Sequence, residues 1–332
     1  MTNSGSDRER PGEFALIAQL FAPLATSAAA FGLADDAAIA TPPSGYDLVV
    51  TADAIVEGVH FFSDDPPEMI AKKALRVNLS DLAAKGCNPS GYLLTLSLPE
   101  RIGMHWLESF VAGLREDQEE FGSSLLGGDT TATPGPLTIA VTAFGHVPRR
   151  AMLRRSGAKA GDLVFVSGTI GDAGGGLACL KGEGSALTPE EQHFLIRRFR
   201  IPEPRARLGP ALIGLASASL DVSDGLLADL GHIADASRVR IEILARKLPL
   251  SSAAQRLWPN ARESVVRAAG AGDDYEIAFT APPEHRADIM QRAAAANTTV
   301  SEIGRVLSGK GIALLDSEGA EISVKQAGYT HF

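Results

Sequence analysis

The stretch DLVVTADAIVEGVHFF, residues Asp47–Phe62, predicts a buried strand that carries an acidic side chain. Its apolar run Leu48–Val50 follows the turn residues PPSG at 42–45, as expected of a strand that leaves a turn. Asp53 stands where this strand is expected to end, and a bend with Gly58–His60 follows. Because an unpaired buried carboxylate is costly, a purely structural role for Asp53 would be unusual.

The same pattern, an apolar run with a glycine nearby and then an aspartate, recurs along the chain. Any one instance is weak, since Asp and Gly are ordinary turn residues. Asp81 could instead pair with Lys85 four residues later, and Asp224 could cap the helix that follows it. Taken together, the positions predict a pool of carboxylate oxygens, which hard divalent cations bind. They are Asp35-Asp36, Asp53, Asp81, Asp129, Asp221 with Asp224, and Asp273-Asp274.

Composition indicates a folded, acidic enzyme of about two domains. Of the 332 residues 45% are hydrophobic and 21% are charged, so the chain can bury a sizeable core. Its 40 acidic and 31 basic residues give a net charge of −9, which disfavours nucleic acid as a partner. The 34 glycines and 19 prolines indicate many turns rather than disorder.

The cysteines favour a reducing compartment, and we expect the protein to be cytoplasmic. There are two, Cys87 and Cys179, and they have neither disulfide nor metal spacing. The apolar stretch Leu16–Ala34 superficially resembles an export signal, but polar residues interrupt it and acidic residues precede it. A packed helix at Glu13–Leu20 is the preferred interpretation. No other stretch is long enough to span a bilayer, so no membrane partner is expected.

Helix and strand signals alternate in two successive blocks, which predicts an α/β protein with two domains. We expect a disordered tail at 1–12, an N-terminal domain at 13–148 and a C-terminal α/β domain at 149–332. The expected helices are Glu13–Leu20, Pro66–Lys85, Met104–Phe121, a helix capped by Thr188 that runs to Arg200, Pro204–Ala216, Leu226–Ser237 and Glu284–Ala296. The expected strands are 37–41, 48–50, 92–98, 137–144, 162–167, 219–222 and 277–280, with a glycine-rich turn at 168–176.

Two further stretches suit phosphate chemistry. In GGDTT, Gly127–Thr131, the glycines let a backbone approach a ligand and Asp129 offers carboxylate oxygens, although a hairpin turn is an equal alternative. A run at 149–159 is basic although the chain as a whole is acidic. Its Arg155 could bind phosphate or belong to a solvated linker. The pattern GxxxxGK[ST] is absent from the chain, which excludes a P-loop kinase.

A series of motifs in fixed order carries a family resemblance from residue 12 to the end of the chain. Together they resemble the thiamine-monophosphate kinase family. This resemblance implies the fold shared with aminoimidazole ribonucleotide synthetase, in which an N-terminal sheet domain binds ATP and Mg²⁺ and dimerises. The motifs are GEFALI (12–17), DD (35–36), TADAIVEGVHF (51–61), KALRVNLSDLAAKG (73–86), GGDTT (127–131), RSGAKAGD (155–162), SGTIGDAG (167–174), LDVSDGL (220–226), AGDDYE (271–276) and GYTHF (328–332).

The resemblance also implies an activity, transfer of the ATP γ-phosphoryl group to thiamine monophosphate, by a homodimer that uses several Mg²⁺ ions. It implies three groups of site residues. The metal ligands would be Asp36, Thr51, Asp53, Asp81, Asp129, Asp221 and Asp224. The ATP contacts would be Gly128, Asp129, Arg155 and Ser223, and the thiamine contacts His60, Asp273 and Tyr329.

Three positions depart from the family pattern. Ala34 stands where a glycine usually precedes the acidic pair, so the local backbone is expected to differ. Ala52 stands where a threonine often precedes the aspartate, which removes one hydroxyl ligand. Asp273 replaces the more common glutamate and is one methylene shorter, so a contact through water is expected.

Phosphoryl transfer depends mainly on positioning and on neutralising charge, which clustered aspartates with Mg²⁺ provide. No Ser, Cys or His stands in a recognisable activated setting, so we expect direct transfer with no covalent nucleophile and no general base. Related enzymes of the fold are alternatives, aminoimidazole ribonucleotide synthetase above all. Selenophosphate synthetase needs an early reactive Cys, and the hydrogenase-maturation dehydratase a C-terminal one; this chain has neither. A nucleotide-binding regulator without turnover is the alternative from another class.

Overall fold

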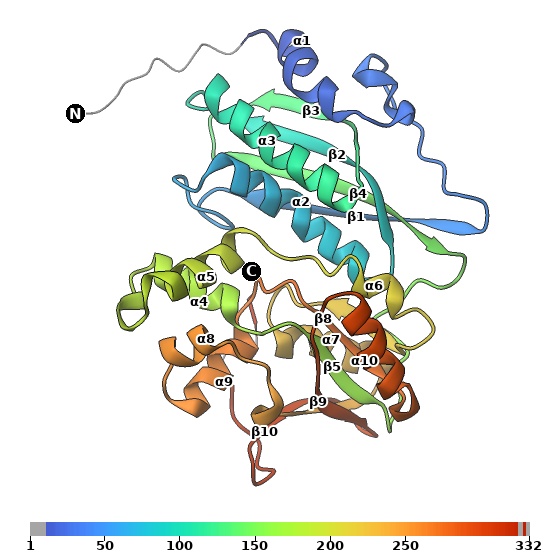
Figure 1. The fold of residues 1–332 in the computed structure, drawn as a ribbon, viewed down its shortest axis with the longest axis vertical. Helices are drawn as coiled ribbons and strands as arrows, with labels where there is room; N and C mark the ends of the chain where they lie inside the picture. The colour runs from blue at the N-terminus through green and yellow to red at the C-terminus, as the bar shows by residue number, and fades with distance from the viewer. Residues whose placement is uncertain (1–10, 325–327, 330–332) are drawn as a thin grey trace. The chain divides into compact units, whose positions relative to one another are not determined.

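The computed structural model describes residues 11–324 and 328–329, and the chain divides into two compact units. Unit 1 takes in residues 11–82 and 89–148, and unit 2 takes in residues 83–88 and 149–324 with 328–329. Each unit has its own sheet (Figure 1). Within the described residues, no helix is both long and apolar enough to cross a lipid bilayer.

Unit 1 is built on a four-stranded sheet in the order β1-β4-β2-β3. β1 (Tyr46–Val56) pairs antiparallel with β4 (Thr138–Pro148), whereas β2 (Asn88–Leu98) pairs parallel with β3 (Leu125–Ala132). β1 is therefore an edge strand. All 11 of its residues are in register with β4, so the strand continues past Val50 and Asp53 lies inside it. The expectation that Asp53 ends the strand is wrong, because pairing with β4 extends it.

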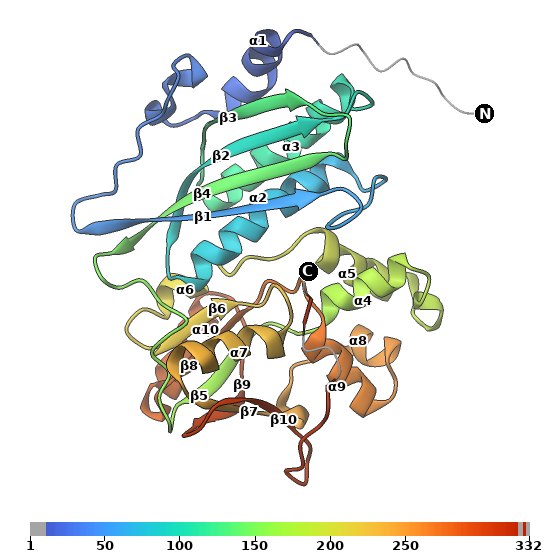
Figure 2. The same ribbon diagram turned by 180° about the vertical axis from the view of Figure 1, so that it is seen from behind.

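Helices α2 (Pro67–Ala84) and α3 (Met104–Phe121) cover one face of this sheet (Figures 1 and 2). Side chains of β2 alternate between the faces: Leu94 and Leu96 are buried, and Thr95 between them is exposed. In Figure 2 the other face is turned toward the viewer, and none of the helices drawn lies over its centre. The face opposite α2 and α3 is called the open face from here on.

The segment before β1 consists of four short helical turns. They are α1 (Glu13–Leu16), the π-helical turn η1 (Ile17–Phe21), and the 3₁₀ turns η2 (Ala22–Leu24) and η3 (Ala28–Leu33). The expected helix at Glu13–Leu20 is thus present, with a change from α to π geometry. The expected strand at 37–41 is wrong, since these residues form no regular structure. Pro42 and Pro43, which follow it, have no backbone N–H with which to continue a ladder.

Unit 2 contains a six-stranded sheet in the order β10-β7-β9-β5-β8-β6. β10 and β7 run parallel, and the other neighbouring strands run antiparallel. The strands are β5 (Leu163–Ser167), β6 (Ala218–Asp221), β7 (Arg240–Leu244), β8 (Ile277–Ala281), β9 (Val300–Leu307) and β10 (Gly311–Leu315). A core of buried residues such as Val164 and Leu230 lies between this sheet and its helices.

The helices of unit 2 are short. They are α4 (Asp172–Leu180), α5 (Pro189–Arg200), α6 (Leu208–Ala211), α7 (Leu226–Ser237), α8 (Ser252–Leu257), α9 (Ala261–Gly270) and α10 (Arg286–Ala295), with 3₁₀ turns η4 (Gly184–Ala186), η5 (Ala245–Lys247) and η6 (Pro283–His285). The predicted capping box of α5 is confirmed: Thr188 and Glu191 exchange side-chain-to-backbone hydrogen bonds.

Two expectations for unit 2 are wrong. The helix expected at Pro204–Ala216 shortens to α6, because Pro210 cannot donate a helical hydrogen bond and Gly214 adopts a φ of +80°. The glycine-rich turn expected at 168–176 gives way to α4 at Asp172. There the carboxylate of Asp274 accepts hydrogen bonds from two N–H groups of the first turn, which the local sequence does not reveal.

Candidate functional site

The edge strand β1 is joined to α2 by side chains that the sequence predicted as metal ligands. The Thr51 hydroxyl donates a hydrogen bond of 2.5 Å to Oδ2 of Asp81, and both residues are half-buried. Asp53 lies two residues further along β1, so its side chain points to the same face as that of Thr51. Its carboxylate is exposed. The structure therefore brings Thr51, Asp53 and Asp81 onto one face, at the edge of the sheet.

Asn78 fixes the backbone of this group. Its Oδ1 accepts the N–H of Asp53 at 3.0 Å, and its Nδ2 donates to the carbonyl of Ala74 at 3.1 Å. The side chain is completely buried, so both ends of the amide are satisfied inside the protein. The sequence motifs had given Asn78 no role.

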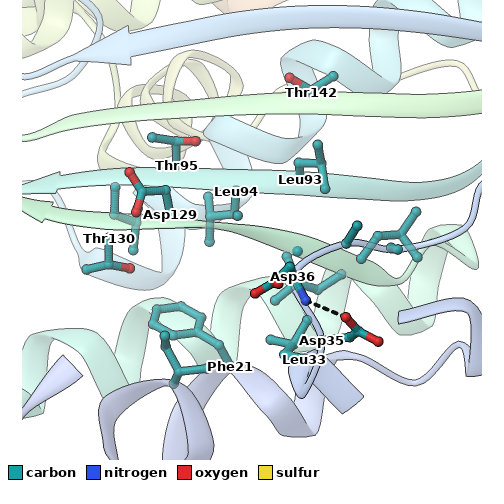
Figure 3. A pocket seen from close by; sticks show the side chains of 18 of the residues that line it. Phe21, Leu33, Asp35, Asp36, Leu93, Leu94, Thr95, Asp129, Thr130 and Thr142 are labelled. Atoms are coloured by element: carbon teal, nitrogen blue, oxygen red, sulfur yellow. Dashed lines mark hydrogen bonds between the residues drawn. The ribbon is translucent and has the colours of Figure 1, made fainter. Parts of the chain in front are cut away.

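Asp36 and Asp129 lie elsewhere in unit 1, around a cavity of about 710 Å³. Figure 3 shows Asp129 beside Thr95 and Thr130 on the sheet, and Asp36 on the segment that follows η3. Apolar side chains complete the lining, among them Ile17, Phe21, Leu33, Leu93 and Phe144. Thr51, Asp53 and Asp81 are not among its lining residues. The predicted metal ligands of unit 1 thus form two groups rather than one.

Gly128 and Asp129 lie inside β3 and not in a turn. Gly128 pairs with Leu94 of β2, and Asp129 pairs with Thr95. A Cβ on Gly128 would lie 1.8 Å from the carbonyl oxygen of Leu94, so only glycine fits there. The close approach inferred from GGDTT is therefore an approach to a neighbouring strand, and the hairpin alternative is wrong.

The Asp35-Asp36 pair forms a local turn, in which the N–H of Asp36 donates to Oδ1 of Asp35 at 2.8 Å (Figure 3). Left-handed backbone precedes it, with φ of +49° at Phe31 and +59° at Leu33. Ala34, by contrast, has φ −96° and ψ −1°, which any residue can adopt. The alanine in place of the family's glycine is therefore compatible with this backbone.

His60 is held in one tautomer by the turn after β1. Its Nδ1 accepts the N–H of Val56 at 3.0 Å, and its own N–H donates to the carbonyl of Val56 at 2.9 Å. A backbone N–H can only donate, so Nδ1 carries no proton and the proton of the neutral ring is on Nε2. Lys73, only 2% exposed, donates its Nζ to the carbonyl of His60 at 2.9 Å.

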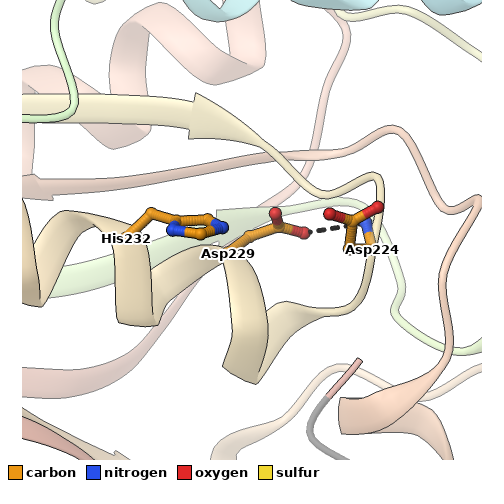
Figure 4. A group of neighbouring side chains, drawn as sticks. All are labelled: Asp224, Asp229 and His232. Carbon is orange, nitrogen blue, oxygen red and sulfur yellow. Dashed lines mark hydrogen bonds between the residues drawn. The ribbon is translucent and has the colours of Figure 1, made fainter. Parts of the chain in front are cut away.

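In unit 2, Asp229 organises the loop between β6 and α7. Its Oδ2 accepts the N–H groups of Ser223, Asp224 and Gly225, each at 3.1 Å. Burial and the neighbouring Asp224 raise the pKa of Asp229 to about 7. One ligand atom each from Asp224, Asp229 and His232 lies within 4.8 Å of the others (Figure 4). Sequence reasoning missed Asp229 and His232; an acidic residue in the first turn of α7 was the available signal.

The predicted substrate residues of unit 2 gather at this loop. The N–H of Asp273 donates to the carbonyl of Ser223 at 2.8 Å, and the N–H of Tyr329 donates to the carbonyl of Asp224 at 2.9 Å. The Tyr329 side chain is 48% exposed. Asp221, the last residue of β6, is buried just before the loop. Residues 330–332 of the motif GYTHF, and 1–10 of the predicted disordered tail, lie outside the described residues.

Arg155 is not brought to Ser223. Its side chain is exposed, and its carbonyl accepts a hydrogen bond from Ser237 at 3.4 Å. Ser237 is the last residue of α7, whereas Ser223 precedes the first turn of that helix. At 1.5 Å per residue, the two ends of α7 are about 16 Å apart. Within unit 2 these two predicted ATP contacts therefore lie at opposite ends of one helix.

Comparison with known proteins identifies the family of this chain. Residues 34–147 match the family model of the AIR synthase related protein N-terminal domain, and residues 159–317 match that of its C-terminal domain. The thiamine-monophosphate kinase of Caulobacter vibrioides is 43% identical over 326 residues, which cover 97% of this chain and 91% of that protein. Both family models fit the two-sheet α/β architecture expected from the sequence.

Solved structures give the same result. The thiamine-monophosphate kinase of Stenotrophomonas maltophilia K279a is 40% identical and superposes with a TM-score of 0.83, covering 94% of this chain and 98% of that one. AaThiL complexed with AMPPCP and TMP is 33% identical, with a TM-score of 0.77, and the match covers 98% of this chain and 100% of that one. This chain belongs to the thiamine-monophosphate kinase family, with the fold of the AIR synthase related proteins.

Proposed function

We propose that this chain transfers the γ-phosphoryl group of ATP to thiamine monophosphate, giving thiamine diphosphate and ADP. The observation that carries the proposal is the cavity of unit 1, where the predicted metal ligands Asp36 and Asp129 share one lining with apolar side chains. Its volume of about 710 Å³ is in the range of small-molecule sites. The related AaThiL was complexed with AMPPCP, a nucleotide analogue, and TMP.

The cavity suits a nucleotide because one part of its lining is apolar and another part is acidic. Phe21, Leu33 and Phe144 offer apolar surface on which a nucleoside could pack. Asp36 and Asp129 are exposed carboxylates that would repel bare phosphates and attract a cation that binds them. We therefore propose that ATP enters unit 1 as its magnesium complex.

The donor set of the predicted metal ligands fits Mg²⁺, which prefers hard oxygen ligands. In unit 1 it consists of the carboxylates of Asp36, Asp53, Asp81 and Asp129 and the hydroxyl of Thr51. The hydrogen bond from Thr51 to Asp81 orients both oxygens, and Asn78 fixes the backbone of Asp53. Asp221 and Asp224 of unit 2 are proposed as further ligands. Bound Mg²⁺ would neutralise phosphate oxygens on the donor and the acceptor, which otherwise repel each other.

For the thiamine end, we propose contacts from His60, Asp273 and Tyr329. His60 would donate from Nε2, since Nδ1 already accepts the N–H of Val56. In unit 2 the backbone bonds of Asp273 and Tyr329 to Ser223 and Asp224 hold the remaining contacts beside one loop. The phosphate acceptor is deprotonated at neutral pH, so the proposed transfer is direct and in line. Neither a general base nor a covalent nucleophile is assigned.

We further propose a homodimer that forms through the open face of unit 1 and works in the cytoplasm. Val50 on that face is a large apolar side chain, 53% exposed. Its neighbours Ala52 and Ala54 are also exposed, and they would let a second sheet approach closely. Sedimentation of wild type and of Val50→Lys tests this: a dimer that becomes a monomer in the variant is expected, and an unchanged mass would exclude this face.

A substrate panel tests the activity. Purified chain with ATP and Mg²⁺ is offered thiamine, thiamine monophosphate or formylglycinamidine ribonucleotide, and ADP release is measured. ADP release with thiamine monophosphate alone is expected, and Asp129→Asn should reduce it about 10²-fold or more, because it removes a charge that stabilises the transferring group. Release only with the ribonucleotide, or none with any acceptor, would refute the proposal.

A further inference from the structure

The loop Gly272–Tyr275 lies directly against the loop that carries Ser223 and Asp224. The N–H of Asp273 donates to the carbonyl of Ser223, and the N–H of Tyr275 donates to the carbonyl of Val222, both at 2.8 Å. The approach is so close that a Cβ on Gly272 would lie 2.6 Å from the carbonyl oxygen of Ser223. The two loops therefore form one backbone-paired platform in unit 2.

This platform requires an unfavourable backbone. Asp273 has a φ of +68° and Tyr275 a φ of +51°, both in the left-handed region that residues with a Cβ rarely adopt. Such a conformation persists only where surrounding contacts determine it. The residue between them, Asp274, is completely buried.

Asp274 is bound at both carboxylate oxygens by the start of helix α4. Its Oδ2 accepts the N–H of Gly171 at 2.6 Å, and its Oδ1 accepts the N–H of Ala173 at 3.1 Å. Its carbonyl accepts Nη2 of Arg198 at 3.2 Å. Burial and, less strongly, the nearby Asp172 raise the pKa of this carboxyl group well above its ordinary value, although the N–H of Gly171 and the charge of Arg198 act in the opposite direction. Asp274 thus ties the strained loop to a helix.

We infer that Asp274 is a positioning residue for the acceptor substrate: by anchoring its loop to α4, it holds the left-handed backbone that keeps Asp273 beside the loop of Ser223 and Asp224. The inference rests on the proposed function, in which Asp273 contacts thiamine monophosphate. It concerns binding of the acceptor and not of ATP, so the two Michaelis constants separate it from a general structural role.

Asp274→Asn is the sharpest test, because it changes the hydrogen-bonding pattern and almost no volume. An amide offers one acceptor oxygen, so one of the two fixed backbone N–H donors would face an NH₂ group. Asp172→Asn is the matched control. Asp172 is also completely buried and is the first residue of the helix α4 that Asp274 binds, but its partners are the hydroxyls of Thr169 and Ser251. Hydroxyls can rotate to donate or accept, so the amide is tolerated there.

We expect Asp274→Asn to raise the KM for thiamine monophosphate about tenfold, the scale of one buried N–H left unpaired, and to leave the KM for ATP within about twofold. Asp172→Asn should leave both constants within about twofold. Equal increases in both Michaelis constants, or the same effect in the control, would overturn the inference.

A double-variant cycle shows whether Asp274 acts through Asp273. Asp273→Ala alone should raise the KM for thiamine monophosphate, and adding Asp274→Asn to it should then have less effect than in the wild type. Full, independent effects would overturn the inference, as would an unchanged KM in Asp273→Ala. Turnover of the wild type with thiamine monophosphate tests the proposed function separately, so the two failures are distinguishable.

If Asp274→Asn does not fold, hydrogen exchange on the wild-type chain decides the question. A loop held in advance should protect the N–H groups of Asp273 and Tyr275 without substrate, to the same degree as those of Gly171 and Ala173. Exchange of Asp273 and Tyr275 at the rate of an open chain, with protection only when thiamine monophosphate is added, would show that the loop is not positioned by Asp274.

Discussion

Asp81 and Asp117 show two ways in which unit 1 holds a carboxylate. Asp117 is completely buried, and Arg76 binds both of its oxygens, at 2.7 and 2.8 Å. Asp81 is half-buried and accepts a hydrogen bond from the neutral hydroxyl of Thr51. A guanidinium compensates a carboxylate's charge, whereas a hydroxyl does not. The charge of Asp81 is therefore available to a bound cation, while that of Asp117 serves the contact between α2 and α3.

This difference predicts opposite outcomes for the same chemical change. Asp53→Asn and Asp81→Asn should each lower kcat by about 10²-fold or more, because each removes a charge that stabilises the transferring phosphoryl group. Their unfolding transitions in urea should stay close to that of the wild type.

The control for these variants is Asp117→Asn. It leaves the buried Arg76 with only the exposed Glu120, at 2.7 Å, as a counter-ion and should lower the free energy of unfolding by about 3 kcal/mol, while the folded fraction keeps its turnover. Near-wild-type kcat in Asp81→Asn would contradict the assignment of Asp81 as a metal ligand.

At the scale of elements, strong local sequence signals were sufficient to predict where helices begin and end. Helices α3 and α7 have the predicted limits, and the capping box of Thr188 opens α5. Strand limits were not predictable in the same way, because they depend on partners distant in sequence. Asp53 lies inside β1 only because β4 pairs with its whole length.

For the candidate site, too, the sequence predicted some features and not others. The motifs singled out the aspartates, but the structure divides those of unit 1 into two groups. In unit 2 it places Asp273 and Tyr329 beside Ser223 and Asp224. The roles of Asn78 and Asp229 were not predictable, since both act on backbone N–H groups. A sequence pattern shows which side chains are available, but it does not show which backbone N–H groups of the folded chain need an acceptor.

The side chain of Glu276 connects β8 to helix α5 and to the loop that follows this helix. It is completely buried, and its carboxylate is bound by Arg198, Arg205 and Ser167. Burial raises its pKa, but the two arginines outweigh burial and leave the pKa below the ordinary value of 4.5. Glu276→Gln should lower the free energy of unfolding by about 3 kcal/mol, since it leaves the buried Arg198 and the half-buried Arg205 with only Glu203, 3.4 Å from each, as a counter-ion.

The pH dependence of stability checks this assignment. A carboxylate whose pKa is lowered by folding stabilises the native state above its unfolded pKa, here 4.5, and loses that contribution as pH falls through the folded value. Acidification below about pH 4.5 should therefore destabilise the wild type more than Glu276→Gln. Glu302→Gln is the matched control: Glu302 also has two cationic partners, but at the surface, so less than about 1 kcal/mol is expected. Equal losses in both variants would contradict the role of burial.

For the molecule as a whole, charge is the main constraint on the proposed reaction. The chain carries a net charge of −9, and both proposed substrates are anions. Its field therefore opposes their approach unless a cation accompanies the phosphates. From the acidic composition and from the predicted metal ligands we therefore expect the proposed reaction to depend on divalent cations. In the proposed mechanism the carboxylates serve as metal ligands, and no side chain has to accept a proton.

The pH profile of kcat/KM for thiamine monophosphate tests whether a side chain accepts a proton. The second ionisation of a phosphomonoester lies near about pH 6, so above it the attacking oxygen is already deprotonated. Nδ1 of His60 accepts the N–H of Val56, which removes that nitrogen as a base. We expect one acid limb near about pH 6 and a flat profile to about pH 8.5 at saturating Mg²⁺. His60→Gln should lower the profile without removing the limb. A second limb near about pH 7, abolished by replacing one particular His or Asp, would reveal a general base and contradict direct transfer.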